Sequence, residues 1–412
     1  MRGSKADENG SFLARELTRA GLAPERMLVV GDDPALLASA LREGLEADLC
    51  VISGGLGPTH DDRTIELLAE TAGRRLVTDA ALESEIEQVA RDVATRLDRP
   101  FADFRPGVRK QASLPEGAQS LGLAGTAPAV LLEHERGVAV ALPGPPGELR
   151  RLWPAALASE PVRAVLERAP APEQRILRLF GPSESAVARA LDEAGGEGDG
   201  LAVTVCASNL EIQVDILSIP QASKRGAALA LAVRERFREE VFAEDERPVA
   251  ELVLAAARAR GYTLATAESC TGGLVAARLT AVPGSSDVFA GAIVAYGNEV
   301  KQRSLGVPRE ILERHGAVSA ETASAMAEGV RSALGVDAAV AVTGVAGPGG
   351  GSGAKPVGLV HVAAVSPDGE IAHELRLPGD REDIRTRATA VSLHALRRLL
   401  AHSDTHSRAF GS

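Results

Sequence analysis

Short apolar segments alternate with amphipathic helical segments, and this alternation restricts the possible folds more than any other feature of the sequence. The apolar segments RMLVVGDD (26–33) and DLCVISGG (48–55) are each followed by a helical pattern, and GVAVALPGPPGELRRLW (137–153) repeats the arrangement. Strand, helix, strand, helix is typical of a parallel sheet with helices on both faces. The pattern predicts an α/β fold for this part of the chain.

A second α/β pattern fills the last part of the chain. Expected helices lie at 249–261, 320–334 and 381–400, and expected strands at 262–267, 289–296, 337–344 and 359–365. Between the two patterns come a Pro- and Ala-rich linker, ERAPAPEQ (167–174), and a short α+β stretch. With 412 residues, more than one domain is expected. We predict three: two α/β domains with parallel or mixed sheets at 1–170 and 249–412, and a small α+β module at 171–248.

Composition excludes several classes of protein. Aromatic residues make up only 3%, so Ala, Val and Leu must build the cores. The net charge of −11 argues against a general binder of nucleic acid. The 3 cysteines are far apart and lack CxxC spacing, which predicts neither disulfides nor zinc and favours a reducing compartment. No apolar run reaches the roughly 18 residues of a membrane span, and no signal peptide is recognisable, so we expect a cytoplasmic protein without membrane contact.

A first candidate site is the glycine-rich segment SGGLGPTHDDRT (53–64), which follows one strand and opens a helix. Such a turn lets a phosphate approach backbone N–H groups at the positive end of the helix. Asp61 and Asp62 would by themselves be ordinary helix-capping residues. A second loop, GPPGE, ends at Glu148 after another strand, and two such loops can form one crevice. Carboxylates beside phosphate-binding glycines suggest a hard cation such as Mg²⁺.

A second candidate site is TAESCTGG (266–273), where a strand ends and a helix begins. Ser269 is placed as a nucleophile would be, although a serine before a helix is most often its N-cap. Cys270 is more often a small buried apolar residue than a reactive thiol. With no partner histidine evident, Lys301 in VAYGNEVK (294–301) is the candidate base, beside Tyr296. In isolation, Lys301 would be a surface cation at a helix start.

Two further features extend the second site. The loop VTGVAGPGGGSGAKPVG (342–358) lies between two expected strands and contains Thr343 and Lys355. It is either a flexible hairpin or a phosphate-facing loop. Arg381 and Arg385 are four residues apart on one helix face, where they either pair with neighbouring acids or hold a phosphate monoester.

The first half resembles a known family. GGLGPTHDDRT, KQASLPEGA, GTAP, LPGPPGE and ADENGSFLAREL are similar to the molybdopterin-binding-like (MoaB/MogA-type) domain of the CinA family. The resemblance implies an ADP-ribose pyrophosphatase that needs a divalent metal (Mg²⁺ or similar) and K⁺. It implies Asp61, Asp62 and Glu148 as metal or catalytic residues, and a phosphate pocket of Gly54, Gly55, Gly57, Thr59, Lys110 and Thr126. Family members begin with a strand and a GTELL- or GDELL-type turn that this chain lacks, so an impaired site is one expectation.

The last part resembles the C-terminal domain of the same family. TAESCTGG, GAIVAYGNEVK, GAVSAETASAMAEGVR, TGVAGPGGG and GDREDIRTRA are similar, in order and spacing, to PncC-type nicotinamide mononucleotide deamidases, and the middle module corresponds to the family's KH-type linker domain. The resemblance implies hydrolysis of nicotinamide mononucleotide (NMN) to nicotinic acid mononucleotide and ammonia, without a cofactor.

In that reaction the residue types have compatible roles. Ser269 or Thr271 would attack the carboxamide, Lys301 would act as base, and Tyr296 and Thr343 would orient it or water. Substrate-binding positions would be Gly272, Gly273, Gly347, Gly349, Gly350, Lys355, Arg381 and Arg385.

Two alternatives of other classes remain. The chain could be a non-catalytic partner protein in competence and recombination, marked by a large exposed apolar patch, or a molybdopterin-binding module that binds without hydrolysis. The Ala-rich helix faces at 320–334 and 386–400 suggest a homodimer.

Overall fold

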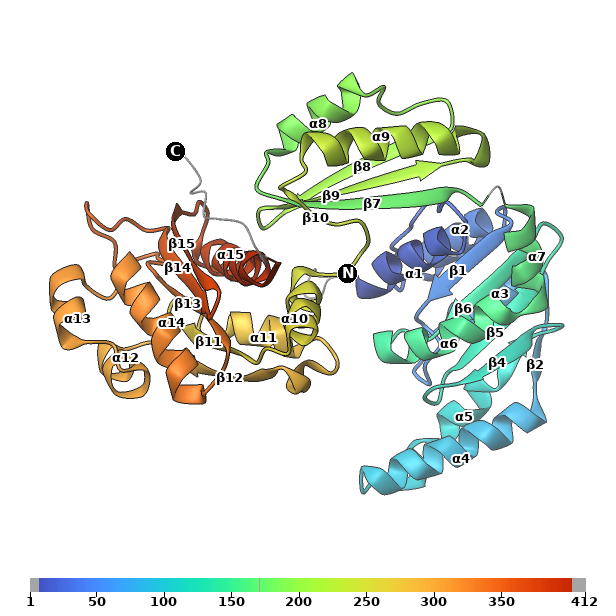
Figure 1. The fold of residues 1–412 in the computed structure, drawn as a ribbon. Coiled ribbons are helices and arrows are strands. Elements are labelled where there is room, and N and C mark those ends of the chain that lie inside the picture. The colour runs from blue at the N-terminus through green and yellow to red at the C-terminus, as the bar shows by residue number, and fades with distance from the viewer. Residues whose placement is uncertain (1–6, 170, 402–412) are drawn as a thin grey trace. The chain divides into compact units, whose positions relative to one another are not determined.

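The computed structural model describes residues 7–169 and 171–401, which divide into two compact units (Figure 1). The first unit contains the described residues up to 174 together with 218–223, and the second contains 175–217 and those from 224 onward. The small module expected at 171–248 therefore falls mostly in the second unit. Its separation as a third domain stays a prediction.

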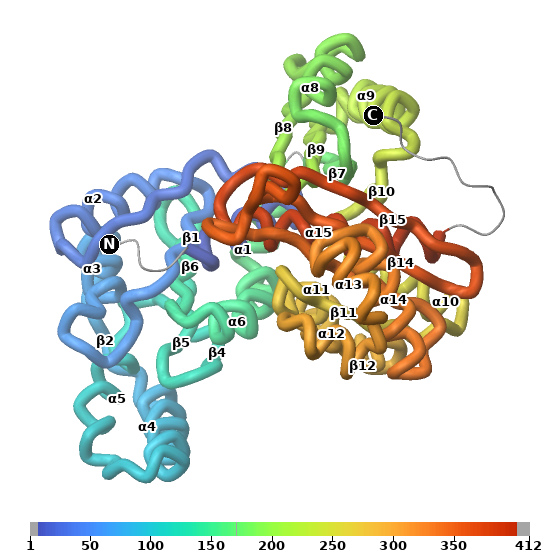
Figure 2. Tube along the Cα trace, turned by 90° about the vertical axis from the view of Figure 1, so that its left-hand side faces the viewer, coloured from blue at the N-terminus to red at the C-terminus, as the bar shows by residue number. Residues whose placement is uncertain are grey.

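The first unit is built around a four-stranded sheet. Its helices are α1 (Glu8–Arg19), α2 (Pro34–Gly44), α3 (Thr64–Thr71), α4 (Ala80–Arg96), α5 (Arg105–Gln111), α6 (Pro146–Ala158) and α7 (Glu160–Arg168), and its strands are β1 (Leu49–Ser53), β2 (Leu76–Thr78), β3 (Ser113–Pro115), β4 (Gln119–Leu123), β5 (Pro128–Glu133) and β6 (Val138–Leu142). The order is β1-β6-β5-β4, and only β1 and β6 are parallel. This sheet is mixed. β2 and β3 form a separate antiparallel pair, and α4 and α5 lie side by side (Figure 2).

The strand expected at 26–33 is absent, so that prediction was wrong. Residues 22–33 have no regular secondary structure, and the side chains of Met27 and Val29 are 59% and 50% exposed. An apolar run becomes a strand only when a neighbouring strand satisfies its backbone groups. The edge strand β1 pairs with β6 alone, and within the described chain no strand pairs with this segment.

The second unit begins with a small antiparallel layer. β7 (Glu173–Phe180), α8 (Glu184–Glu193), β8 (Leu201–Ser208), β9 (Glu211–Ser218), α9 (Ser223–Arg236) and β10 (Val241–Ala243) follow in sequence. The strands take the order β10-β7-β9-β8, and α8 and α9 cover one face (Figure 1). Alternate residues of β9, such as Val214 and Ile216, are fully buried in the core under these helices. The α+β pattern is as expected, and the KH-type identity stays a prediction.

The larger part of the second unit is a five-stranded sheet between two helical layers. Its strands are β11 (Leu264–Glu268), β12 (Phe289–Val294), β13 (Ala338–Gly344), β14 (Leu359–Ser366) and β15 (Gly369–Arg376), and its helices are α10 (Val249–Arg260), α11 (Leu274–Thr280), α12 (Asn298–Leu305), α13 (Arg309–His315), α14 (Ala320–Leu334) and α15 (Arg381–Ala401). The order is β12-β11-β13-β14-β15, with the first three strands parallel and the last two antiparallel.

Each face of this sheet has its own core of small apolar residues. One core lies under α10, α11 and α15, and the other lies under α12, α13 and α14 (Figure 1). Alternation along β11 sends Leu264 to the first core and Ala265 to the second. The carboxyl ends of β11, β12 and β13 meet at one edge, which is where ligands bind in such sheets. Among the described helices, none combines the length and the apolar character needed to cross a bilayer.

Gly329 allows α12 to approach α14 closely. A Cβ at this position would lie 1.9 Å from the carbonyl oxygen of Leu305, the last residue of α12. Ala normally stabilises a helix interior relative to Gly, by roughly 1 kcal/mol. Here we expect Gly329→Ala instead to lower the free energy of unfolding by about 2 kcal/mol, because α12 must move.

Urea denaturation followed by circular dichroism measures this effect. Gly147→Ala is the control, because a Cβ at the second residue of α6 meets no atom within 4 Å. An equal loss of stability in both variants would contradict the close packing of α12 on α14.

Candidate active site

Ser269 and Lys301 form a buried pair at the carboxyl edge of the five-stranded sheet. Ser269 directly follows β11, and its N–H donates to the carbonyl of Val342 at 2.9 Å, so the strand pairing fixes its backbone. Lys301 belongs to α12, and its side chain is buried with 1% of the residue exposed. Lys301 Nζ lies 3.0 Å from Ser269 Oγ.

The rest of the lysine environment consists of backbone carbonyls. Lys301 Nζ lies 2.7 Å from the carbonyl oxygen of Ala295 and 3.3 Å from that of Tyr296. Burial lowers the pKa of Lys301 below its usual value, since the charged ammonium loses its hydration. The sequence placed this lysine at a strand end or on the surface; the structure places it inside a helix, facing the serine.

Cys270 is not suited to act as the nucleophile. Its side chain lies in the apolar core beside α11, and burial raises the pKa of its thiol to about 12. The thiolate is the reactive form of cysteine, so this thiol is inert near neutral pH.

The two threonines among the candidate catalytic residues of this site, Thr271 and Thr343, are engaged elsewhere. Thr271 is fully buried, and its hydroxyl donates to Glu268 Oε2 at 2.7 Å. The hydroxyl of Thr343 donates to the carbonyl of Ala317 at 2.7 Å. Ser269 is thus the candidate hydroxyl that the structure brings to the lysine.

Gly272 and Gly273 form the turn between β11 and α11. Their φ angles of +63° and +102° lie in the left-handed region, which favours glycine. The N–H of Gly272 donates to the Ser269 carbonyl at 3.2 Å, and the N–H of Gly273 donates to Glu268 Oε2 at 2.8 Å. We call residues 269–273 the nucleophile loop. These two N–H groups, at positions expected to bind substrate, are occupied by acceptors of the protein.

Glu268 was not recognised from the sequence as part of the site. Its side chain is fully buried, and its carboxylate accepts hydrogen bonds from the nucleophile loop and from the first turn of α11. The signal was present, because an acidic residue at the end of a strand as apolar as LATAE must have a compensating set of donors.

Arg381 links two parts of the site. One of its N–H groups donates to the Gly347 carbonyl at 2.6 Å, and another donates to the Tyr296 hydroxyl at 3.0 Å. Tyr296 is 63% exposed, and its hydroxyl accepts a hydrogen bond from Arg381 rather than contacting Lys301. Arg381 therefore joins the glycine loop to the segment that precedes α12.

Arg385, one turn further along α15, supports the nucleophile loop. Its Nη2 donates to the Thr271 carbonyl at 2.9 Å and its Nε to the Cys270 carbonyl at 3.3 Å, while Nη1 pairs with Glu382 at 3.1 Å. The expected pair of arginines is therefore divided: Arg381 reaches the glycine loop, and Arg385 holds backbone carbonyls.

The glycine loop after β13 is partly open. Gly349 and Gly350 are exposed, and a Cβ at either position would meet no atom within 4 Å. Gly347 is buried, with Val357 packed against it. The ammonium group of Lys355 donates to the carbonyl of His315 at the end of α13.

In the first unit, the glycine turn after β1 contains paired carboxylates. The hydroxyl of Thr59 lies 2.5 Å from both Asp61 Oδ1 and Asp62 Oδ2, and its carbonyl accepts from the ammonium of Lys110. The hydrogen bond from Thr59 is the main cause of the lowered pKa of Asp61. Asp62 also packs against Gly57, where a Cβ would lie 2.4 Å from its carboxylate.

The two expected loops of this unit come together. A Cβ on Gly54 would lie 3.8 Å from Gly144 Cα, and the amide of Asn9 bridges the Ser53 hydroxyl and the Gly144 carbonyl at 2.8 and 2.7 Å. The hydroxyl of Thr64 donates to the Gly54 carbonyl and packs against Gly55.

Glu148 lies in the first turn of α6 and is only partly exposed. Its carboxylate packs against Gly125, next to the half-buried Thr126, and burial raises its pKa. Among the described residues, no group of three or more His, Cys, Asp or Glu side chains is arranged to hold a metal ion. Asp61 and Asp62 are together, but the predicted set with Glu148 does not form such a group.

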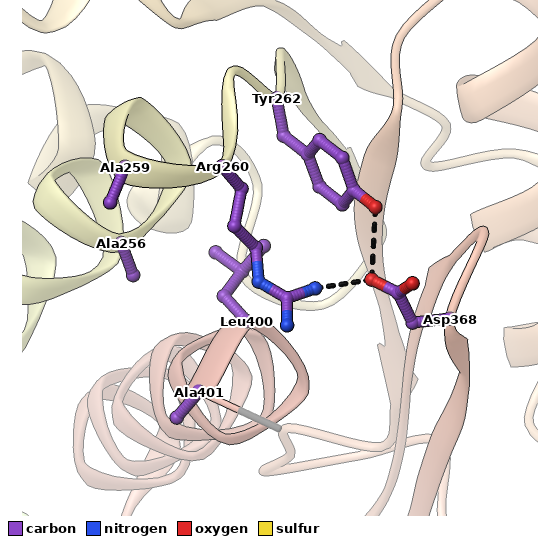
Figure 3. Close-up of a pocket in the computed structure, with 7 residues that line it drawn as sticks. All are labelled: Ala256, Ala259, Arg260, Tyr262, Asp368, Leu400 and Ala401. Atoms are coloured by element: carbon purple, nitrogen blue, oxygen red, sulfur yellow. Dashed lines mark hydrogen bonds and ion pairs between the residues drawn. The ribbon is translucent and has the colours of Figure 1, made fainter. Parts of the chain in front are cut away.

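A hollow of about 540 Å³ lies at the other end of β11 (Figure 3). Figure 3 shows Arg260 and the hydroxyl of Tyr262 directed at Asp368, with Leu400 and alanines completing the wall. Asp368 thus accepts hydrogen bonds from both the Arg260 guanidinium and the Tyr262 hydroxyl. None of the candidate residues lines this hollow.

Two family models match the sequence. Residues 246–400 match the CinA C-terminal domain, and residues 1–161 match a probable molybdopterin binding domain. A CinA-like protein from Mycolicibacterium paratuberculosis is 42% identical over 420 residues, which covers 97% of this chain and 96% of the relative. One from Mycobacterium tuberculosis is 41% identical over 411 residues, covering 97% and 95%. The solved structure of a competence/damage-inducible protein from Agrobacterium tumefaciens is 42% identical, covers 38% of this chain and 99% of its own, and has a TM-score of 0.36.

Proposed function

The chain belongs to the CinA family, and from this premise we propose that its second unit hydrolyses the carboxamide of NMN to nicotinic acid mononucleotide and ammonia. The observation that carries the proposal is the contact between Lys301 Nζ and Ser269 Oγ at 3.0 Å, in a buried site where the pKa of the lysine is lowered.

Three oxygen atoms, of the Ser269 hydroxyl and of the Ala295 and Tyr296 carbonyls, surround Lys301 Nζ and can accept all three N–H groups of its protonated form. A neutral amine has two N–H groups and one lone pair. Once the lysine is deprotonated, the carbonyls of Ala295 and Tyr296 would accept these two N–H groups, and the lone pair would be left for the hydroxyl of Ser269. In this form the lysine can accept the proton of the serine, as a general base must.

The reaction then proceeds in two halves. Lys301 takes the hydroxyl proton while Ser269 Oγ attacks the carboxamide carbon, and the lysine returns this proton to the nitrogen as the C–N bond breaks and ammonia leaves. In the second half, Lys301 takes a proton from water and the resulting hydroxide attacks the acyl-serine. The lysine then returns this proton to the serine oxygen as the carboxylic acid leaves, and the acid loses its own proton to solvent. One water is consumed and one ammonia is released.

Two groups of residues support the charged parts of the substrate. We propose the backbone N–H groups of Cys270 and Thr271, in the nucleophile loop, as donors to a developing oxyanion. The phosphate would lie between Arg381, which retains further donors, and the open glycines Gly349 and Gly350. Arg385 is already engaged with backbone carbonyls.

Ammonia release from NMN by the purified protein tests the proposal. Release that depends on Ser269 would support it. A folded wild-type protein that releases no ammonia would overturn it, and the partner-protein alternative would then come first, because the exposed apolar residues Met27–Val30 resemble the patch that a docking protein needs.

The second hydrolysis, of ADP-ribose with a divalent ion and K⁺, is a proposal that rests on the family alone. No group of three or more His, Cys, Asp or Glu side chains among the described residues is arranged to hold a metal ion, so we derive no step through a metal. We expect any AMP release from ADP-ribose to require added Mg²⁺ and to be lost in Asp61→Asn. Absence of AMP release from the folded wild type would remove this activity, and binding of a molybdopterin without hydrolysis would favour the module alternative.

A further inference from the structure

We propose that Glu268 is a positioning residue of the amidase site: its buried carboxylate fixes the nucleophile loop and thereby the place of the Ser269 hydroxyl. The inference rests on the function proposed above and adds a residue that does not touch the reacting atoms.

The carboxylate of Glu268 accepts hydrogen bonds from backbone N–H groups at the start of α11. Its Oε2 accepts from the N–H of Gly273 at 2.8 Å and of Val275 at 3.1 Å, and its Oε1 accepts from the N–H of Ala276 at 2.8 Å. The first N–H groups of a helix have no partner inside the helix, and the positive end of the helix dipole favours a negative charge. Glu268 therefore caps α11 from the preceding strand.

Two hydroxyl groups complete this set. Thr271 donates to Oε2 at 2.7 Å, and Thr266 donates to Oε1 at 3.2 Å. A fully buried carboxylate is tolerated only when its oxygens are hydrogen-bonded, and here each oxygen has both a backbone and a hydroxyl donor. Five hydrogen bonds fix the orientation of the carboxylate. Because Thr271 and Gly273 supply two of them, the nucleophile loop is fixed as well.

Arg385 holds the same loop from its carbonyl side. Glu268 binds N–H and hydroxyl groups of the loop, whereas Arg385 donates to the carbonyls of Cys270 and Thr271. Successive side chains of an extended strand point to opposite faces. Glu268 is therefore directed to α11 while Ser269 is directed to Lys301 on α12, and the glutamate acts on the serine through the backbone alone.

Glu268→Gln tests the proposal, because an amide keeps one acceptor oxygen and places an N–H₂ group where the other oxygen was. We expect kcat for NMN to fall by roughly 10- to 100-fold while KM changes by less than about 3-fold, since a misplaced nucleophile slows chemistry more than binding. We also expect amide hydrogen exchange to become faster in peptides that cover 269–276.

Asp337→Asn is the matched control at the other end of β11. Asp337 accepts from the N–H and the hydroxyl of Thr263, both at 2.8 Å, so its loss also removes a carboxylate that holds this strand. It should lower the melting temperature but leave kcat per folded molecule unchanged. An equal fall of kcat in both variants would assign Glu268 a merely structural role and overturn the proposal.

A second pair of variants applies if Glu268→Gln does not fold. Thr271→Val removes one donor from the carboxylate, and Thr271→Ser restores it. We expect kcat to fall by roughly 3- to 10-fold in the first and to recover in the second. Equal values in the two would contradict the proposal.

The exchange measurement needs no substrate, which separates the two proposals. If the wild type releases no ammonia, the amidase proposal fails. Amide hydrogen exchange in residues 269–276 then tests by itself whether Glu268 fixes the nucleophile loop. Unchanged exchange in folded Glu268→Gln overturns the positioning role, and faster exchange supports it.

Discussion

Ser269→Ala should reduce ammonia release from NMN by at least roughly three orders of magnitude. The substitution removes the hydroxyl that lies 3.0 Å from Lys301 Nζ, and losing the nucleophile of a covalent mechanism removes most of the catalysis. Only 8% of Ser269 is exposed, and Ala is smaller than Ser, so the substitution introduces no steric clash and the fold should be retained. Steady-state assays of ammonia release measure the effect, and the melting temperatures of wild type and variant are compared to confirm that both are folded.

The neighbouring thiol provides the discriminating comparison. Cys270→Ala should keep turnover within a few-fold of wild type, because burial holds the pKa of this thiol at about 12 and the thiol is not the reacting group. If Cys270→Ala lost as much activity as Ser269→Ala, the assignment of the nucleophile would be wrong.

The second large effect concerns Lys301 and the dependence of the rate on pH. A base acts in its unprotonated form, so kcat should rise with pH through the pKa of Lys301 and then level off. Burial lowers this pKa below 10.5, so the rise should be centred below that pH. Measurement of kcat from about pH 6 to about pH 10 tests this prediction. A rate that falls steadily with rising pH across this range would exclude the lysine as the base.

Lys301→Arg and Lys301→Met separate the proton from the charge. Arginine keeps a positive charge but remains protonated, whereas methionine keeps much of the volume without a charge. Both should lose activity by roughly three orders of magnitude. Retained activity in Lys301→Arg would show that the site needs a cation rather than a base.

Local sequence patterns predicted most elements of the fold. Helices such as α2 and α10 have the apolar spacing of an amphipathic helix, with Asp33 capping the first and the left-handed Gly261 ending the second. The patterns failed where structure depends on distant partners. RMLVVGDD has a strand composition but no strand beside it. The strand β15 was not among the expected strands, and it pairs along its whole length with β14.

The same distinction applies to the site. The sequence identified Ser269 and Lys301 as candidates because each lies beside a strand end, but it could not choose between Ser269 and Thr271. The choice follows from strand geometry, which directs Ser269 to α12 and gives the Thr271 hydroxyl to Glu268. Arg381 and Arg385 look equivalent on one helix face, and only the packing of α15 against two different loops separates their roles.

The chemical pair and the glycine loop come from separate stretches of chain. Ser269 and Lys301 are fixed by β11 and α12, whereas residues 345–358 join the antiparallel strands β13 and β14. A connection between two strands can change in length and sequence without altering their register. Under the proposed function, substitutions in this connection can therefore change which nucleotide is bound without moving the serine–lysine pair, so relatives that share the pair are free to differ in substrate.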